Sequence, residues 1–83
     1  MEKAIRLKVR KELDPRGQLA VIKLKGSLIS KGYTQIIHIS DQDGEFHINA
    51  FETGAEKRND ARQHIAAFIS AEHIEDAVSL QGD

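Results

Sequence analysis

The chain has 83 residues, a formal net charge of −1 and no cysteine, so disulfide bonds and thiolate metal sites are excluded. This length predicts a single domain, residues 1–83, with a core near the lower limit of comfortable size. No apolar run approaches membrane-spanning length, and the start of the chain has the features of neither a signal peptide nor a transit peptide. We therefore expect a cytoplasmic protein with no membrane partner.

The first part of the chain has the pattern of a β-hairpin. Residues 5–9 alternate between apolar and charged side chains, which is the period of a half-buried strand. Residues 14–17, Asp-Pro-Arg-Gly, suit a type I turn, and residues 19–25 alternate again. Pairing the two segments through this turn would place Val9 opposite Ile22 on the core side.

A second hairpin is expected in the middle of the chain. Residues 33–40 are rich in β-branched side chains, and residues 45–51 form the second predicted strand. The Asp-Gly pair that ends residues 41–44 is a strong hairpin signal. One face of these strands is expected to face the core, and it consists of Ile37, Ile39, Phe46, Ile48 and Ala50.

The C-terminal third predicts a helix. Thr53 and Glu56 fit a capping box, and Asn59 is a rival N-cap. The apolar residues that follow recur at helical spacing, and they are Ala61, Ile65, Phe68 and Ile69. The phase of this pattern breaks near Ser70, which indicates a kink or a short second helix that would bury Ile74 and Val78.

These elements predict an α+β fold. Two hairpins would form a four-stranded, mainly antiparallel sheet, and the C-terminal helix would pack on one face of it.

The basic residues concentrate in the N-terminal part of the chain. Residues 1–26 carry eight Lys or Arg against three carboxylates, a charge of +5, whereas residues 27–83 carry four against ten, a charge of −6. In the predicted hairpin Lys8 faces Lys23 and Arg6 faces Lys25, and such like-charge pairs are destabilising unless an anion lies near them.

A nucleic-acid backbone could be that anion. The residues predicted to contact it are Arg6, Lys8, Arg10, Lys23 and Lys25, with Lys57 and Arg58 near the start of the C-terminal helix as further phosphate contacts. Two alternatives remain open. In the first, the lysines only protect an exposed sheet, and in the second, the acidic segment that contains Glu72, Glu75 and Asp76 lies over the basic strands.

A second candidate surface is apolar. Leu19, Val21, Ile36 and Phe51 fall on the side of the predicted sheet that should face water, and such patches often mark interfaces. Residues 71–80 could instead cover them. This patch, or the acidic half of the chain, supports an alternative function: a protein-binding accessory or inhibitor protein of the kind found in mobile elements, acting as a dimer.

Catalytic and metal-binding patterns are weak. His38 and His47 are expected on the same outer face, which would be a possible zinc arrangement, although an exposed polar face is the favoured interpretation. No serine lies in a nucleophile motif, and the glycines form no phosphate-binding loop. We therefore predict a non-enzymatic binding protein without cofactor, metal or catalytic residues, which associates with nucleic acid through the basic strands.

Overall fold

The computed structural model describes residues 2–81, with side chains from residue 4 onward. In chain order the elements are β1 (Glu2–Arg10), α1 (Pro15–Ser30), β2 (His38–Asp41), β3 (Phe46–Gly54), α2 (Ala55–Glu72) and β4 (Val78–Leu80). The strands form one antiparallel sheet in the order β2-β3-β1-β4. The predicted α+β class with a four-stranded antiparallel sheet is confirmed.

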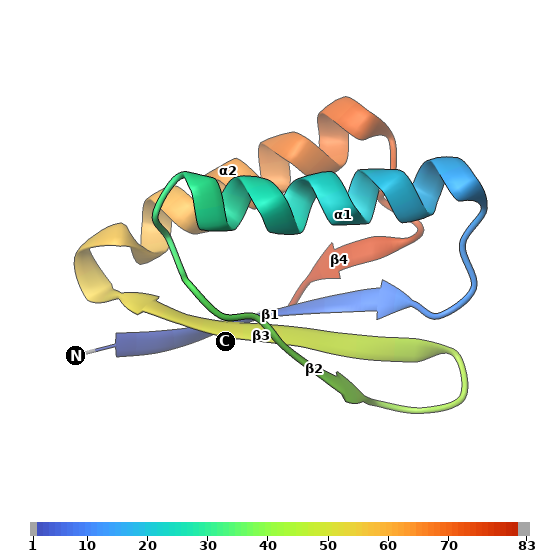
Figure 1. The fold of residues 1–83 in the computed structure, drawn as a ribbon, viewed down its shortest axis with the longest axis horizontal. Coiled ribbons are helices and arrows are strands. Elements are labelled where there is room, and N and C mark those ends of the chain that lie inside the picture. Colours follow the sequence, from blue (N-terminus) through green and yellow to red (C-terminus); the bar gives the residue numbers. More distant parts are fainter. Residues whose placement is uncertain (1, 82–83) are drawn as a thin grey trace.

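Both helices cover the same face of the sheet, and the other face is left open (Figure 1). Two β-α-β units interlock, since β3 lies between β1 and β2 and β1 lies between β3 and β4. This arrangement has the topology called ferredoxin-like or split β-α-β. The core lies between the helices and the covered face of the sheet.

The predicted N-terminal hairpin is wrong, because its second strand, residues 19–25, is part of helix α1. The supposed turn is the start of that helix. The Asp14 side chain accepts a hydrogen bond from the Gly17 backbone N–H at 2.7 Å, and Pro15 occupies the first helical position. The alternation in residues 19–25 fits both periods over so short a window. The buried residues of the whole helix follow only the helical spacing, and they are Gly17, Ala20, Val21, Leu24 and Leu28.

Helix α1 ends in a Schellman motif rather than in a loop between strands. Gly32 has a φ of 81°, and its N–H donates to the Ile29 carbonyl at 3.0 Å. The Tyr33 N–H donates to the Leu28 carbonyl at 3.0 Å, which completes the motif. The glycine is required here because the left-handed conformation strains other residues.

The predicted C-terminal helix is confirmed as α2, and its buried residues are Ala61, Ile65 and Ile69. Its N-cap is Gly54 rather than the expected Thr53, so the predicted start is displaced by one residue. The Thr53 side chain instead points into the covered layer, where its hydroxyl is buried without a hydrogen-bond partner in residues 4–81.

The C-terminal segment forms a turn and strand β4, not the kinked or second helix that we expected. Helix α2 ends at His73 in the left-handed conformation, and the Ile74 N–H donates back to the Ile69 carbonyl at 3.1 Å. Strand β4 then pairs with β1, with Val78 opposite Val9. Pairing with β1 satisfies backbone groups that a second helix would have left unpaired at this edge.

The faces of the strands agree with the sequence for β1 and disagree for β3. Ile5, Leu7 and Val9 are buried against the helices as predicted. On β3 the buried residues are Asn49, Phe51 and Thr53, and the three residues predicted for the core, Phe46, Ile48 and Ala50, point to the open face.

Candidate nucleic-acid interface

Alternate residues of the three strands β1, β2 and β3 make up the open sheet face. The register places Arg6 opposite Ala50, Lys8 opposite Ile48 and Arg10 opposite Phe46 on this face. We use the name open sheet face for the set Ala4, Arg6, Lys8, Arg10, His38, Ser40, Phe46, Ile48, Ala50 and Glu52. No helix covers it (Figure 1).

An aromatic ring lies among the cations of this face. The Lys8 Nζ lies 4.3 Å from the centroid of the Phe46 ring, and the Arg10 guanidinium carbon lies 5.7 Å from it. Both distances are within the range of cation–π attraction. The ring is half-buried, so part of its surface is accessible to a ligand.

The neighbouring negative charge comes from Glu52 of β3 and from the β2–β3 loop rather than from the acidic C-terminal segment. The pKa of the Asp43 carboxyl is lowered, first by a hydrogen bond from the Glu45 backbone N–H, and further by the Phe46 N–H and the charges of Lys8 and Lys11. The contact of the C-terminal segment with this face is a backbone one, in which Arg10 Nε donates to the Asp76 carbonyl at 2.9 Å.

In residues 4–81, no carboxylate lies within 4 Å of the cationic groups of Arg6, Lys8 or Arg10. The interpretation that Glu72, Glu75 and Asp76 neutralise the basic strands therefore has no ion pair to support it. These three cations remain available to an external anion.

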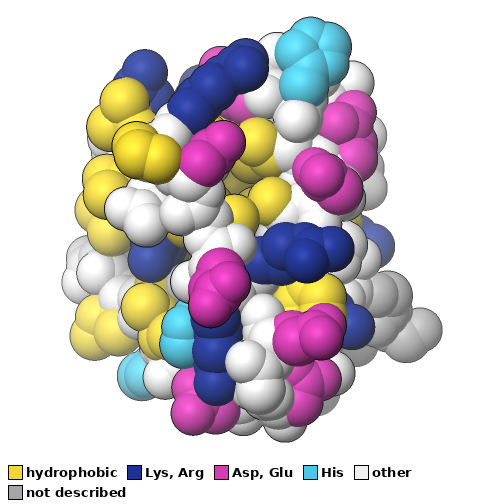
Figure 2. Space-filling view, turned by 90° about the vertical axis from the view of Figure 1, so that its right-hand side faces the viewer, with side chains coloured by type: hydrophobic (Ala, Val, Ile, Leu, Met, Phe, Trp, Pro, Cys, Tyr) yellow, Lys and Arg dark blue, Asp and Glu magenta, His cyan; other side chains and the backbone are white. Residues whose placement is uncertain are grey.

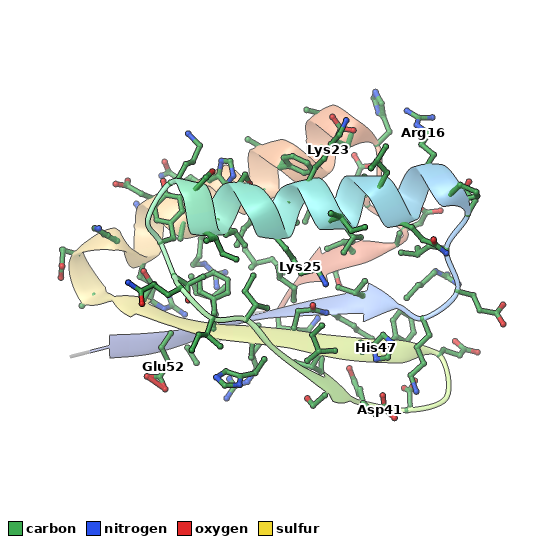
Figure 3. All side chains as sticks on the ribbon, viewed as in Figure 1. Arg16, Lys23, Lys25, Asp41, His47 and Glu52 are labelled. Atoms are coloured by element: carbon green, nitrogen blue, oxygen red, sulfur yellow. The ribbon has the colours of Figure 1, made fainter. Side chains whose placement is uncertain are left out.

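The other predicted cations lie elsewhere. Lys23 points away from the sheet above α1, and Lys25 points from the same helix toward the covered side of the sheet (Figure 3). The like-charge pairs expected for Lys8 and Arg6 do not exist, because Lys8 lies between Ile48 and Ser79. This correction follows directly from the helical conformation of residues 15–30.

Lys57 and Arg58 lie in the first turns of α2, in the helix layer. They do not join the open sheet face, which lies on the opposite side of the sheet from both helices (Figure 1). Arg58 is half-buried and already interacts within the chain.

The predicted apolar interface residues divide into two groups. Leu19 and Ile36 are exposed by 53% and 64%. The prediction that Val21 and Phe51 lie on a solvent-exposed surface is wrong, since they are core residues exposed by 8% and 1%. Ile22, Ile29 and Ile39 are also exposed, by 62%, 48% and 56%, so the prediction that Ile22 and Ile39 lie in the core is wrong. A helical interpretation of residues 19–29 would have found the first two.

The two central histidines do not share a face. His38 lies on the open sheet face opposite Ala50, whereas His47 lies opposite Val9 on the covered side. His47 Nδ1 is 3.2 Å from the Asp41 carboxylate. Within residues 4–81 there is no group of three His, Asp or Glu side chains that could hold a metal ion.

A Ser–His contact that the sequence did not predict joins the two helices. The Ser27 hydroxyl oxygen lies 2.7 Å from the Leu24 carbonyl and 2.8 Å from His64 Nε2, and the tautomer of His64 sets which of the two side chains donates the second bond. Burial, and then the charge of Lys31, lower the pKa of His64. This contact ties α1 to α2.

No protein-family model, curated protein or solved structure matches this chain. Among the described residues, no helix is long and apolar enough to cross a membrane. Because one fold can host many functions, the open sheet face itself is the basis for a functional proposal.

Proposed function

We propose that this protein is a non-enzymatic nucleic-acid-binding protein, and that a single strand lies across the open sheet face. The observation that supports the proposal is the placement of Arg6, Lys8 and Arg10 around Phe46, with the Lys8 ammonium 4.3 Å from the ring centroid. The proposal assumes the cytoplasmic location expected from the sequence.

The chemistry of this face suits an unpaired strand. Lys and Arg neutralise phosphates, and an aromatic ring accepts the stacking face of any base. Bases in a duplex stack on one another, so only an unpaired base can reach Phe46 on a flat sheet. His38 and Ser40 add polar groups on the β2 side, where sugar and base edges could be contacted.

Fluorescence anisotropy with labelled, mixed-sequence single-stranded RNA and DNA tests the proposal. We expect binding at low salt, with log Kobs falling against log salt with a slope of about −2, since each of three phosphate contacts contributes about 0.7 for single strands. A duplex of the same sequence should bind more weakly. Comparison of the affinities for RNA and DNA shows whether the protein prefers ribose or deoxyribose.

Charge reversal at Lys8 supplies the specific test, and Lys23 supplies the matched control. Lys8→Glu should weaken binding at least about tenfold, because it removes one charge-assisted contact and adds repulsion. Lys23→Glu makes the same charge change in the helix layer and should alter the affinity less than about twofold by long-range electrostatics alone. Undetectable binding of wild-type protein at low salt, or equal losses in the two variants, would refute the proposal.

A second candidate function, binding of a protein partner, is supported by a different surface. The side chains of Leu19, on α1, and Ile36, just before β2, are both exposed. Exposed apolar surface of this kind often marks an interface. Sedimentation at several concentrations tests self-association first, because it requires no knowledge of another partner.

A further inference from the structure

One side of the molecule is unusually apolar. Figure 2 shows hydrophobic side chains gathered along its left edge, which is the near side of Figure 1, where α1 and β2 lie. Five large apolar side chains of this side are about half exposed or more. We call this surface the α1–β2 face, and it consists of Leu19, Ile22, Gly26 and Ile29 on α1, Ile36 just before β2 and Ile39 on β2.

Gly26 has no structural role in the isolated chain that explains the choice of glycine. It lies in the interior of α1, where glycine destabilises a helix relative to alanine. A Cβ at this position would have no atom within 4 Å, so the packing of the single chain does not require glycine. A glycine on an exposed helix face does permit close approach of a second backbone.

The apolar residues of α1 form a self-complementary pattern. Successive members of Leu19, Ile22, Gly26 and Ile29 are three, four and three residues apart, a spacing that reads the same in both directions. In an antiparallel pair of α1 helices, Leu19 therefore lies opposite Ile29 of the second copy, and Ile22 lies opposite its Gly26. At the two central positions Ile22 of each copy therefore packs against the Gly26 of the other, which has no side chain. The twofold axis repeats each contact.

The free edge of β2 continues this surface. The Gln42 N–H donates to the Phe46 carbonyl just beyond the strand, and ladder bonds fall on alternate residues. The backbone groups of Ile39 and Asp41 therefore point to the free edge. Neither proline nor lysine protects this strand, although such residues commonly block exposed edges.

A groove joins the helix to the strand on the same side. Its volume is about 300 Å³, and Ile22 and Lys25 of α1 line it together with Ile39 of β2. The centre of the helical pattern, between Ile22 and Lys25, therefore lies beside the centre of the β2 edge at Ile39. A single twofold axis can relate both α1 and β2 to their copies.

We propose that a second copy of this chain binds the α1–β2 face, with the α1 helices antiparallel and the two β2 edges side by side. This inference does not depend on the proposed function, because the open sheet face is a separate surface. The two sheets would continue one another, and their open faces would lie on the same side of the dimer.

Sedimentation equilibrium of the full chain between about 1 and 500 μM tests the proposal over the affinity range of small homodimers. We expect a closed monomer–dimer equilibrium. Gly26→Gln should weaken dimerisation at least about tenfold, because a side chain then occupies the place of the Ile22 contact. At low concentration, where both proteins are monomers, this variant should melt about 3 °C higher than wild type, because glutamine favours a helix more than glycine does.

Ala67→Gln is the matched control, since it adds the same side chain at an exposed position of α2, outside the α1–β2 face, and should leave the dimer affinity unchanged. The higher melting temperature of Gly26→Gln distinguishes lost dimerisation from lost folding. A wild-type chain that stays monomeric throughout, assembly beyond a dimer, or an unchanged dimer in Gly26→Gln would each overturn the proposal.

Cysteine cross-linking tests the register, because the natural chain contains no cysteine. Leu19→Cys and Ile29→Cys chains should form a disulfide-linked dimer rapidly when they are mixed and oxidised. Each variant alone should cross-link at least about tenfold more slowly, since like positions lie far apart in an antiparallel pair. Equal rates in the mixture and in either single variant would contradict the antiparallel arrangement.

Discussion

The two faces of the sheet are built from the same strands and differ in almost every other respect. Strand β1 directs Ile5, Leu7 and Val9 to the covered face and charged residues to the open one. Strand β3 does the same with its two phenylalanines, since Phe51 is buried beneath the helices and Phe46 lies among the cations. Stability and the proposed binding therefore depend on alternate residues of the same strands, and substitutions should separate them.

The largest expected difference is between the two phenylalanines. Phe51→Ala should cost about 3–5 kcal/mol, because it leaves a cavity in the core. That loss approaches the whole free energy of unfolding expected for a chain of this length, about 4–12 kcal/mol. Phe46→Ala should cost less than about 1 kcal/mol. Urea unfolding of both variants checks the prediction, and similar losses would show that the open face also contributes to the core.

The same pair should give the reverse result in binding. If Phe46 stacks on a base, Phe46→Ala lowers the affinity for single strands by about 1–3 kcal/mol, a factor of roughly 5 to 150. Phe46→Tyr keeps the ring and should retain most of the affinity. Anisotropy titrations at fixed salt measure the affinities of both variants. An unchanged affinity for Phe46→Ala would show that the cations alone account for binding.

A smaller effect is expected at the end of α2, far from the open face. His73 adopts a φ of 56°, which strains a residue with a Cβ. His73→Gly should therefore raise the free energy of unfolding by about 1 kcal/mol, and nucleic-acid affinity should not change. Thermal melting at pH 7.5 measures the gain. A loss of stability would mean that the histidine side chain makes a contact worth more than the strain.

The smallest effect concerns pH. The folded chain lowers the pKa of His64, so the unfolded state binds the proton more readily. The contribution of this group to stability is present above pH 6.5, the ordinary pKa of histidine, and is lost as the pH falls through the lowered value. Melting temperatures from pH 8 to pH 5 should decline less in His64→Gln than in wild type. Parallel declines would show that other groups dominate the acid sensitivity.

The sequence predicted the fold best where one periodicity persists. Strict alternation identified β1, and the spacing of Ala61, Ile65 and Ile69 identified α2. The prediction failed for residues 19–25 because a pattern of only seven residues satisfies both the strand period and the helix period. The choice depended on residues 14–17, where Asp followed by Pro serves a turn and a helix start equally well. The formation of β4 depends on pairing with β1, 69 residues earlier for Val78 and Val9, which local pattern cannot show.

The candidate site was predicted in part for the same reasons. Alternation along β1 placed Arg6, Lys8 and Arg10 together, and the structure agrees. Phe46 was missed because its apolar character suggested the core, whereas Asn49 occupies a buried position on that strand. Only the register with β1 decides which phase of β3 faces the helices. Lys23 and Lys25 were lost from the site together with the predicted hairpin.

The position of β1 at the centre of the sheet has a consequence for biosynthesis. The strand that leaves the ribosome first pairs with β3 and β4, and β4 is formed by residues 78–80. Among neighbouring strands, only β2 and β3 follow one another directly in the chain. Such non-local pairing slows folding and delays it until the whole chain is available. During synthesis β1 must therefore keep one edge unpaired until residues 78–80 have been made, and the charged residues of that strand help to hold it apart from other nascent chains.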